Sequence, residues 1–212
     1  MESPTVAELY ERVAPQFDEI AAASGYAGPA WLAAQLPRLP GLTRAVDFGC
    51  ATGALGKILR ARYPAAHLTG VDFAQQMVER ARDLGVYDAI VRHDLNRPVV
   101  WMRARSLDLV VALGFSEFLE RPADLVAEAA RILVPGGVLF MSFQQHLQDS
   151  PECAPRVTSG GGIPHHAYTI DEVRAMLSGV GFSVDLIEAI TGYVSRSGFA
   201  HPYLMVAASR PS

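Results

Sequence analysis

The spacing of apolar positions along the chain changes near residue 44. Before it, residues 5–24 place apolar side chains at helical intervals, with a kink expected at Pro15, and residues 30–36 predict a second short helix. After it, short apolar runs alternate with helical stretches. This pattern predicts a helical N-terminal cap followed by an α/β core.

The core pattern is typical of a parallel sheet covered by helices on both faces. Three expected strands, at 46–48, 107–113 and 138–143, are almost continuously apolar, as strands buried on both faces are. In full, we expect strands at 44–49, 67–73, within 87–94, at 106–114 and at 136–143, with helices at 54–62, 74–84 and 121–133.

The last part of the chain departs from this alternation. A helix is expected at 169–182, where Thr169 and Glu172 form a capping box, and two strands follow at 182–190 and 202–209 with no helix between them. Strands joined in this way are antiparallel neighbours. The predicted fold is therefore α/β: a Rossmann-like, doubly wound sheet of seven strands, mostly parallel with the last strand antiparallel, plus the helical cap.

The length of 212 residues fits a single domain, with the cap at 1–43 and the core at 44–212. Within the core, residues 144–168 are polar and rich in glycine and proline. In a doubly wound sheet this segment leaves the carboxyl edge of the strands, where ligands bind. Long loops of this kind are commonly functional, so we expect a substrate loop here.

Composition narrows the class of protein further. Half of the residues are apolar, the formal net charge is −4, and no run of five basic residues occurs, which disfavours a nucleic-acid partner. Two cysteines are too few for a disulfide framework. The start of the chain shows no secretory pattern and no apolar run is long enough to span a bilayer, so we expect a cytoplasmic protein without a membrane partner.

A loop of small residues, DFGCATG at 47–53, lies between the first expected strand and helix. A nucleotide ligand needs small residues here, because the backbone must approach it closely. The dinucleotide fingerprint would need glycine at Ala51 and Ala54, and a phosphate loop would need Ser or Thr at Ile58. Both motifs fail, which disfavours a nicotinamide-dependent reductase.

Acidic residues lie near the ends of the first three expected strands. Asp47 precedes the small-residue loop, Asp72 ends the second strand, and Asp94 follows the third. A carboxylate at the end of the second strand can accept hydrogen bonds from a ribose diol. The alternatives are structural: Asp47 as a turn cap, Asp72 as the N-cap of the next helix, and Asp94 as an ordinary loop residue.

Taken in order, six segments resemble the class I S-adenosylmethionine (SAM)-dependent methyltransferases. They are DFGCATG (47–53), GVD (70–72), HDL (93–95), LDLVVALGFSEFL (107–119), LVPGGVLFMSF (133–143) and YTIDEVRAMLSGVGF (168–182). The resemblance covers 44–209, and the N-terminal segment is similar to small-molecule-type members with a Gly-Tyr-x-Gly-Pro turn. The departure is Ala51, where the family usually has glycine.

This resemblance implies SAM as the cofactor and S-adenosylhomocysteine (SAH) as its product. It implies that Asp47 helps hold the amino group, that Asp72 binds the ribose hydroxyls, and that Phe73 lies against the adenine. The expected cofactor-binding residues are Asp47, Gly49, Ala51, Gly53, Asp72, Phe73, Asp94, Leu95, Leu113 and Gly114.

Three histidines, His146, His165 and His166, fall in the expected substrate loop. A histidine there is a candidate general base or acceptor-positioning residue, since its pKa lies near neutrality. The alternative is that these residues only line or cover the pocket. No acidic partner lies at ligand spacing within the loop, so we expect no metal site.

Aromatic residues of the N-terminal segment are candidates for the acceptor site. Tyr10, Phe17, Tyr26 and Trp31 either pack on the sheet or close over the acceptor and the sulfonium, whose positive charge favours aromatic faces. Tyr168, at the end of the substrate loop, is a further candidate substrate contact.

The leading hypothesis is a SAM-dependent methyltransferase for a small-molecule acceptor, with O- or N-methylation favoured over C-methylation. Only one lysine occurs among many Ala, Arg, Gly and Pro residues, a composition compatible with a high-GC bacterial source and with natural-product biosynthesis. We expect a monomer or homodimer. The alternative is a SAM- or SAH-binding protein that catalyses a cyclisation or rearrangement, or acts as a binding module.

Overall fold

The computed structural model describes residues 5–36, 39–147, 157–160 and 163–211. Residues 148–156 and 161–162 of the expected substrate loop lie outside these ranges.

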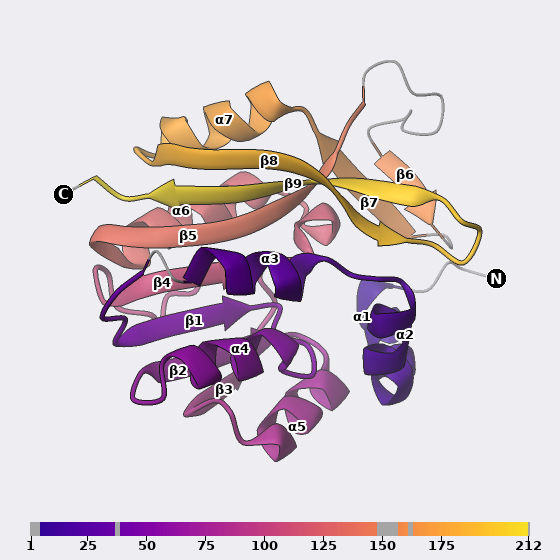
Figure 1. The fold of residues 1–212 in the computed structure, drawn as a ribbon, viewed down its shortest axis with the longest axis horizontal. Coiled ribbons are helices and arrows are strands. Elements are labelled where there is room, and N and C mark those ends of the chain that lie inside the picture. Colours follow the sequence, from indigo (N-terminus) through magenta and orange to yellow (C-terminus); the bar gives the residue numbers. More distant parts are fainter. Residues whose placement is uncertain (1–4, 37–38, 148–156, 161–162, 212) are drawn as a thin grey trace.

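A twisted sheet forms the centre of the molecule (Figure 1). Its strands follow the order β3-β2-β1-β4-β5, and β5 then pairs with β9, which pairs with β8. These strands are β1 (Arg44–Phe48), β2 (His67–Asp72), β3 (Ala89–Arg92), β4 (Leu107–Ala112), β5 (Leu133–Gln145), β8 (Ser183–Val194) and β9 (Ala200–Ser209).

The final strand runs against its neighbours, as predicted. β9 is antiparallel both to β5, with Phe140 opposite Ala207, and to β8, with Ile190 opposite Tyr203. The five strands before it pair in parallel. The predicted doubly wound sheet with one reversed final strand is confirmed.

An additional hairpin corrects part of the expected loop at 144–168. β6 (Val157–Gly160) and β7 (Ile163–Tyr168) pair with each other, and β7 continues the sheet beside the end of β5, where Gln144 lies opposite Ala167. The polar, glycine-rich sequence does not show a strand pattern. Long-range pairing with β5 imposes the strand, and such pairing overrides local propensity.

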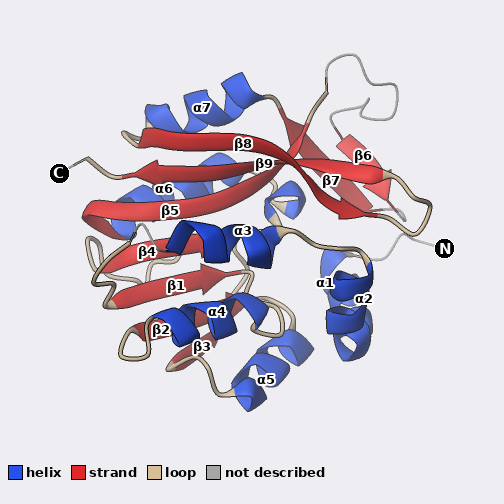
Figure 2. Ribbon diagram, in the orientation of Figure 1, coloured by secondary structure: helices blue, strands red, loops and turns tan. Residues whose placement is uncertain are grey.

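Helices cover both faces of the sheet (Figure 2). One face buries α3 and α4 through Leu32 and Leu59, and the other buries α6 and α7 through Val126 and Leu177. The helices are α1 (Val6–Val13), α2 (Phe17–Ala23), α3 (Gly28–Gln35), α4 (Ala54–Arg62), α5 (Gln75–Leu84), α6 (Pro122–Ile132) and α7 (Ile170–Gly179).

The N-terminal cap, formed by α1 and α2, lies beyond the carboxyl end of β1 (Figure 1). Glu11 accepts hydrogen bonds from the backbone N–H groups of Gln75 (2.6 Å) and Gln76 (3.0 Å), at the N-terminus of α5. A carboxylate is favourable there because it meets unpaired N–H groups and the positive end of the helix dipole. The expected kink at Pro15 is present as a short 3₁₀ turn between α1 and α2.

None of the helices in the described ranges combines the length and apolar character that crossing a bilayer requires.

Candidate active site

A cavity of about 540 Å³ lies between the cap and the carboxyl edge of the sheet. Four segments form its walls: the cap, the small-residue loop after β1, the ends of β2 and β3, and the segment after β4. It therefore lies at the point where the chain leaving β1 and the chain leaving β4 continue to opposite sides of the sheet, which is the usual ligand position in doubly wound sheets.

Most of the predicted cofactor and aromatic residues meet in this cavity. Those that line it are Tyr10, Phe17, Tyr26, Gly49, Ala51, Asp72, Phe73, Asp94, Leu95, Leu113 and Gly114. Asp47 and Gly53 lie behind this wall, within the strand and loop that support it.

The loop after β1 turns sharply through left-handed backbone conformations. Gly49 has a φ of 67°, Ala51 of 45° and Gly53 of 97°. A Cβ on Gly49 would lie 2.4 Å from the Phe115 ring, so only glycine fits there. Ala51 adopts a conformation that disfavours any side chain, and its N–H donates to Asp72 Oδ2 at 2.9 Å.

Asp72 combines the two roles that the sequence left open. It is only 5% exposed, lines the cavity, and accepts hydrogen bonds from the N–H groups of Ala51 (2.9 Å) and Ala74 (3.0 Å). Burial raises its pKa, and these two hydrogen bonds oppose the rise. Each oxygen keeps a second lone pair, so the carboxylate can also accept from a ligand hydroxyl.

The Asp47 side chain is 1% exposed, and only one of its two carboxylate oxygens has a hydrogen-bond partner. Its Oδ2 accepts a hydrogen bond from the Tyr87 hydroxyl at 2.6 Å, whereas Oδ1 is buried without a partner. Burial raises the pKa of Asp47 to about 7, against the lowering effect of the Tyr87 hydrogen bond. A buried carboxylate with a free oxygen is costly and is therefore a candidate ligand contact.

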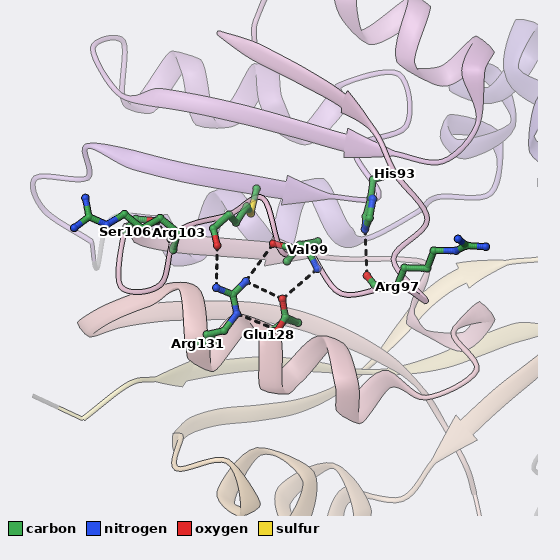
Figure 3. Close-up of polar contacts among 8 residues, drawn as sticks. His93, Arg97, Val99, Arg103, Ser106, Glu128 and Arg131 are labelled. Carbon is green, nitrogen blue, oxygen red and sulfur yellow. Dashed lines mark hydrogen bonds and ion pairs between the residues drawn. The ribbon is translucent and has the colours of Figure 1, made fainter.

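The segment after β3 supplies another part of the cavity wall, and hydrogen bonds to α6 hold it in place. Figure 3 shows Arg131 and Glu128 of α6 bracing this segment. Arg131 donates to the carbonyls of Val99 (3.1 Å) and Met102 (2.8 Å), and Glu128 accepts from the Val99 N–H at 3.1 Å. Asp94, at the start of this segment, lines the cavity.

The cap is also tied to the small-residue loop. Thr52 is buried and donates its hydroxyl to Asp18 Oδ1 at 2.5 Å, and Asp18 forms an ion pair with Arg80 of α5 at 3.6 Å. Phe17, next to Asp18, lines the cavity. Opening the cap would therefore break a contact to the loop itself.

Two predicted substrate residues do not reach the cavity. Trp31 is 7% exposed, packs edge-on against Phe140 and donates its indole N–H to Glu188 at 3.0 Å. It lies on α3, which belongs to the helical layer on the sheet face and not to the roof of the cavity. Tyr168 instead packs edge-on against Phe143, with ring centroids 5.7 Å apart.

The three candidate histidines occupy different surroundings. His165 lies edge-on to the ring of Phe118, a wall residue, with centroids 4.9 Å apart, and burial lowers its pKa. His166 is its neighbour on β7 and points to the opposite face of that strand. His146 follows β5, and its Nδ1 is buried without a partner. Only His165 contacts the wall of the cavity through the ring pairs described.

Sequence reasoning missed a buried acid, Glu117, in the 3₁₀ turn Ser116–Phe118 after β4. It is 3% exposed; Oε1 accepts a hydrogen bond from the Tyr203 hydroxyl of β9, and Oε2 is buried without a partner. Burial raises the pKa of Glu117. The signal for it was an acid within the apolar stretch GFSEFL, directly after a buried strand.

Among the described residues, no group of three or more His, Cys, Asp and Glu side chains is arranged to hold a metal ion.

Comparison with known proteins agrees with this geometry. Residues 46–141 match the sequence profile of the family described as "Methyltransferase domain". A malonyl-[acyl-carrier protein] O-methyltransferase of Geobacter sulfurreducens is 32% identical over 156 residues, 68% of this chain and 58% of that protein. A trans-aconitate 2-methyltransferase of Azoarcus sp. is 31% identical over 115 residues, 54% of this chain and 44% of that one.

The fold is shared with several solved structures. The [4+2]-cyclase SpnF superposes with a TM-score of 0.76 at 18% identity, over 100% of this chain and 98% of its own. A SAM-dependent methyltransferase from Mesorhizobium loti gives 0.66 at 22% identity, over 85% and 96%. At these identities the likeness is one of fold.

The fold and cavity thus define a doubly wound protein with a capped cavity at the carboxyl edge of its sheet. In sequence the chain is similar to methyltransferases, and it has the fold of the SAM-dependent methyltransferases, whose cofactor is SAM and whose product is SAH. It spans about half the length of the curated relatives it matches.

Proposed function

We propose that this protein transfers a methyl group from SAM to a small-molecule acceptor, at oxygen or nitrogen. The observation that carries the proposal is the capped cavity at the β1–β4 switch, with Asp72 in its wall and the buried, unpaired Asp47 oxygen behind it. Bound SAM supplies an activated methyl group, so the protein needs to bind the cofactor and the acceptor, align them, and exclude water.

The residues present fit the cofactor. Asp72 has lone pairs to spare for a ribose diol, and the free Asp47 oxygen suits an ammonium group, directly or through water. Gly114 lines the cavity without a side chain, and a Cβ there would lie 2.4 Å from the Tyr26 hydroxyl oxygen, so glycine lets Tyr26 pack against this part of the wall. The rings of Tyr10 and Phe17 offer aromatic faces to a sulfonium.

Different residues of the chain then bind the two parts of the cofactor, exclude water and position the acceptor. Asp94 and Leu95 hold the adenine edge, and Leu113 and Gly114 present backbone at the methionine end. The cap excludes water through its aromatic wall residues. Of the three candidate histidines, His165 is the one we retain as an acceptor-positioning residue or base, because its ring packs on Phe118.

The test is calorimetric titration of the purified protein with SAM, SAH and NAD in parallel, followed by incubation with methyl-deuterated SAM and a panel of acceptors. We expect micromolar binding of SAM and SAH and a product heavier by one labelled methyl group. Binding of NAD in their place would contradict the proposal.

The fold alone does not decide the reaction, because SpnF is described as a cyclase. Tight SAH binding without labelled product across the panel would favour the alternative, a SAM- or SAH-binding protein that catalyses a cyclisation or rearrangement. Mass spectrometry of the products separates the two, since a rearranged product keeps the mass of its substrate.

A further inference from the structure

One tyrosine, Tyr87, lies in the segment that joins α5 to β3, and its ring packs against two glycines of neighbouring elements. A Cβ on Gly56 would overlap this ring, and a Cβ on Gly70 would lie 3.2 Å from it. Gly56 is inside the helix α4 and Gly70 inside the strand β2, where glycine lowers stability relative to alanine. Both glycines therefore make room for the same ring.

The Tyr87 hydroxyl reaches the acid of β1. Asp47 lies opposite Gly70 in the parallel register of β1 and β2, so no side chain of β2 separates the ring from Asp47 at this position. The hydroxyl donates to Asp47 Oδ2 at 2.6 Å, which is the length of a charge-assisted hydrogen bond. Burial raises the pKa of Tyr87 well above its usual value, and the Asp47 carboxylate adds to the rise, so the hydroxyl keeps its proton and acts as the donor.

The backbone on both sides of Tyr87 is anchored. Arg60 of α4 donates to the carbonyl of Val86 at 3.0 Å and forms an ion pair with Asp88 at 2.7 Å. Asp88 also accepts from the N–H of Leu68 at 2.7 Å and donates its own N–H to the Leu68 carbonyl at 2.9 Å. The position of Tyr87 is therefore set by α4 and β2.

Asp47 and Tyr87 both lie behind the cavity wall, next to the small-residue loop. Asp47 comes directly before this loop, of which Gly49, Ala51 and Thr52 line the cavity. Asp47 Oδ1 has no hydrogen-bond partner among the described residues. Any effect of Tyr87 on a ligand in the cavity must therefore pass through Asp47 and the loop that follows it.

We propose that Tyr87 is a positioning residue for the amino-acid part of the cofactor: its hydroxyl holds one oxygen of Asp47 and leaves the other for the ammonium group. This inference rests on the proposed function, in which Asp47 meets that group directly or through water. Tyr87 does not touch the ligand itself. It fixes the rotation of the Asp47 carboxylate, and its hydrogen bond favours the ionised form of that acid.

Two ligands that share the adenosine and the sulfur test the inference: SAH, and 5′-methylthioadenosine, which lacks the amino-acid part. Each is titrated by calorimetry against wild type and against Tyr87→Phe, which keeps the ring and removes only the hydroxyl. We expect this variant to weaken SAH binding by about five- to tenfold and 5′-methylthioadenosine binding by less than about twofold. A loss for SAH no larger than the loss for 5′-methylthioadenosine would overturn the inference.

A double variant shows whether Tyr87 acts through Asp47. When Tyr87→Phe is added to Asp47→Asn, the charge that Tyr87 positions is already gone. We expect the further loss of SAH affinity to be less than about twofold. A further loss as large as in the wild-type background would show a different route and would overturn the inference.

Tyr63→Phe is the matched control, because Tyr63 packs in the same apolar cluster as Tyr87 but lies outside the cavity wall. Its hydroxyl donates to the carbonyls of Leu36 (2.9 Å) and Leu39 (2.7 Å). This variant should lower the melting temperature and leave both affinities unchanged. A selective loss of SAH binding in Tyr63→Phe would overturn the inference, since general loosening would then explain it. Wild-type protein that binds neither ligand would instead refute the proposed function.

Discussion

The cavity has two ends that are built in different ways: the one we propose for the cofactor, the cofactor end, and the one we propose for the acceptor, the acceptor end. At the cofactor end, one short loop does most of the work: Gly49, Ala51 and Gly53 take left-handed backbone conformations, and Asp72 is fixed by backbone N–H groups. At the acceptor end, side chains from the cap and from the segment after β4 line the cavity, and Tyr203 of the last strand donates to Glu117 behind that wall. The first end is therefore a compact, local structure, whereas the second depends on side chains from segments that are distant in the sequence.

The largest expected effect tests the cofactor end. In Asp72→Ala, SAH loses the acceptor for its ribose hydroxyls, and the N–H of Ala51 loses its partner. We expect the SAH affinity measured by calorimetry to fall by about 100-fold or more, corresponding to about 3 kcal/mol.

The matched control is Asp94→Ala, because Asp94 is a half-exposed wall residue. It should lose about tenfold or less. If both variants lost affinity equally, Asp72 would not be the anchor of the cofactor end.

A second expected effect concerns the free energy of unfolding, which the ionisation of buried Asp47 lowers. The pKa of Asp47 is raised to about 7 in the folded state from 3.8, so folding favours its protonated form. The stability that comes from a protonated Asp47 in the folded state is fully present below pH 3.8 and is lost as pH rises through about 7. Asp47→Asn should therefore gain stability over wild type between pH 4 and pH 8, on the order of 2 kcal/mol.

Denaturant unfolding at several pH values measures this difference, in which the other titrating groups cancel. The same variant should bind SAH more weakly at pH 8, because it lacks the charge for the ammonium group. A pH-independent difference in stability would show that Asp47 keeps an ordinary pKa.

A third expected effect concerns the hydrogen bond that ties the cap to the small-residue loop. Asp18→Asn weakens the charge-assisted bond from Thr52, which we value at about 1 kcal/mol. SAH release, followed by stopped-flow displacement, should accelerate by about fivefold if the cap opens to let the ligand leave.

Asp124→Asn is the control, since Asp124 makes an exposed ion pair with Arg121 on α6. It should leave the release rate unchanged. Equal rates in Asp18→Asn and wild type would show that SAH leaves without movement of the cap.

The smallest expected effect is a gain. Ala51 has a φ of 45°, so Ala51→Gly should raise the free energy of unfolding by about 1 kcal/mol. Ala61→Gly, in the regular helix α4, should lower it by about 0.5–1 kcal/mol. Denaturant unfolding of both variants checks the opposite signs.

The contrast between the two ends also explains what the sequence could and could not predict. The alternation of strands and helices, the reversed final strand and the capping box at Thr169 follow from local patterns, and the structure contains them. The loop after β1 is likewise local, and Asp72 follows it at the end of the next strand.

The acceptor end could not be predicted in this way, because its residues meet only through tertiary contacts. Glu117 and Tyr203 lie 86 positions apart, and no spacing in the sequence joins them. For Trp31 the sequence left two alternatives open, and the structure has the one in which it packs on the sheet; its place in a series of cap aromatics could not separate them. The β6–β7 hairpin depends on pairing with β5 and was hidden by its polar composition.

The attachment of the cap to β8 has a consequence for synthesis. Ala27 donates its N–H to the carbonyl of Gly192, Val194 donates to Ser24, and the Trp31 indole donates to Glu188 across 157 positions. A ribosome makes Glu188 157 positions after Trp31, at about 5–20 residues per second. During that interval the cap can be held only by its contacts to α5 and to the loop after β1, and its attachment to β8 is the last to form.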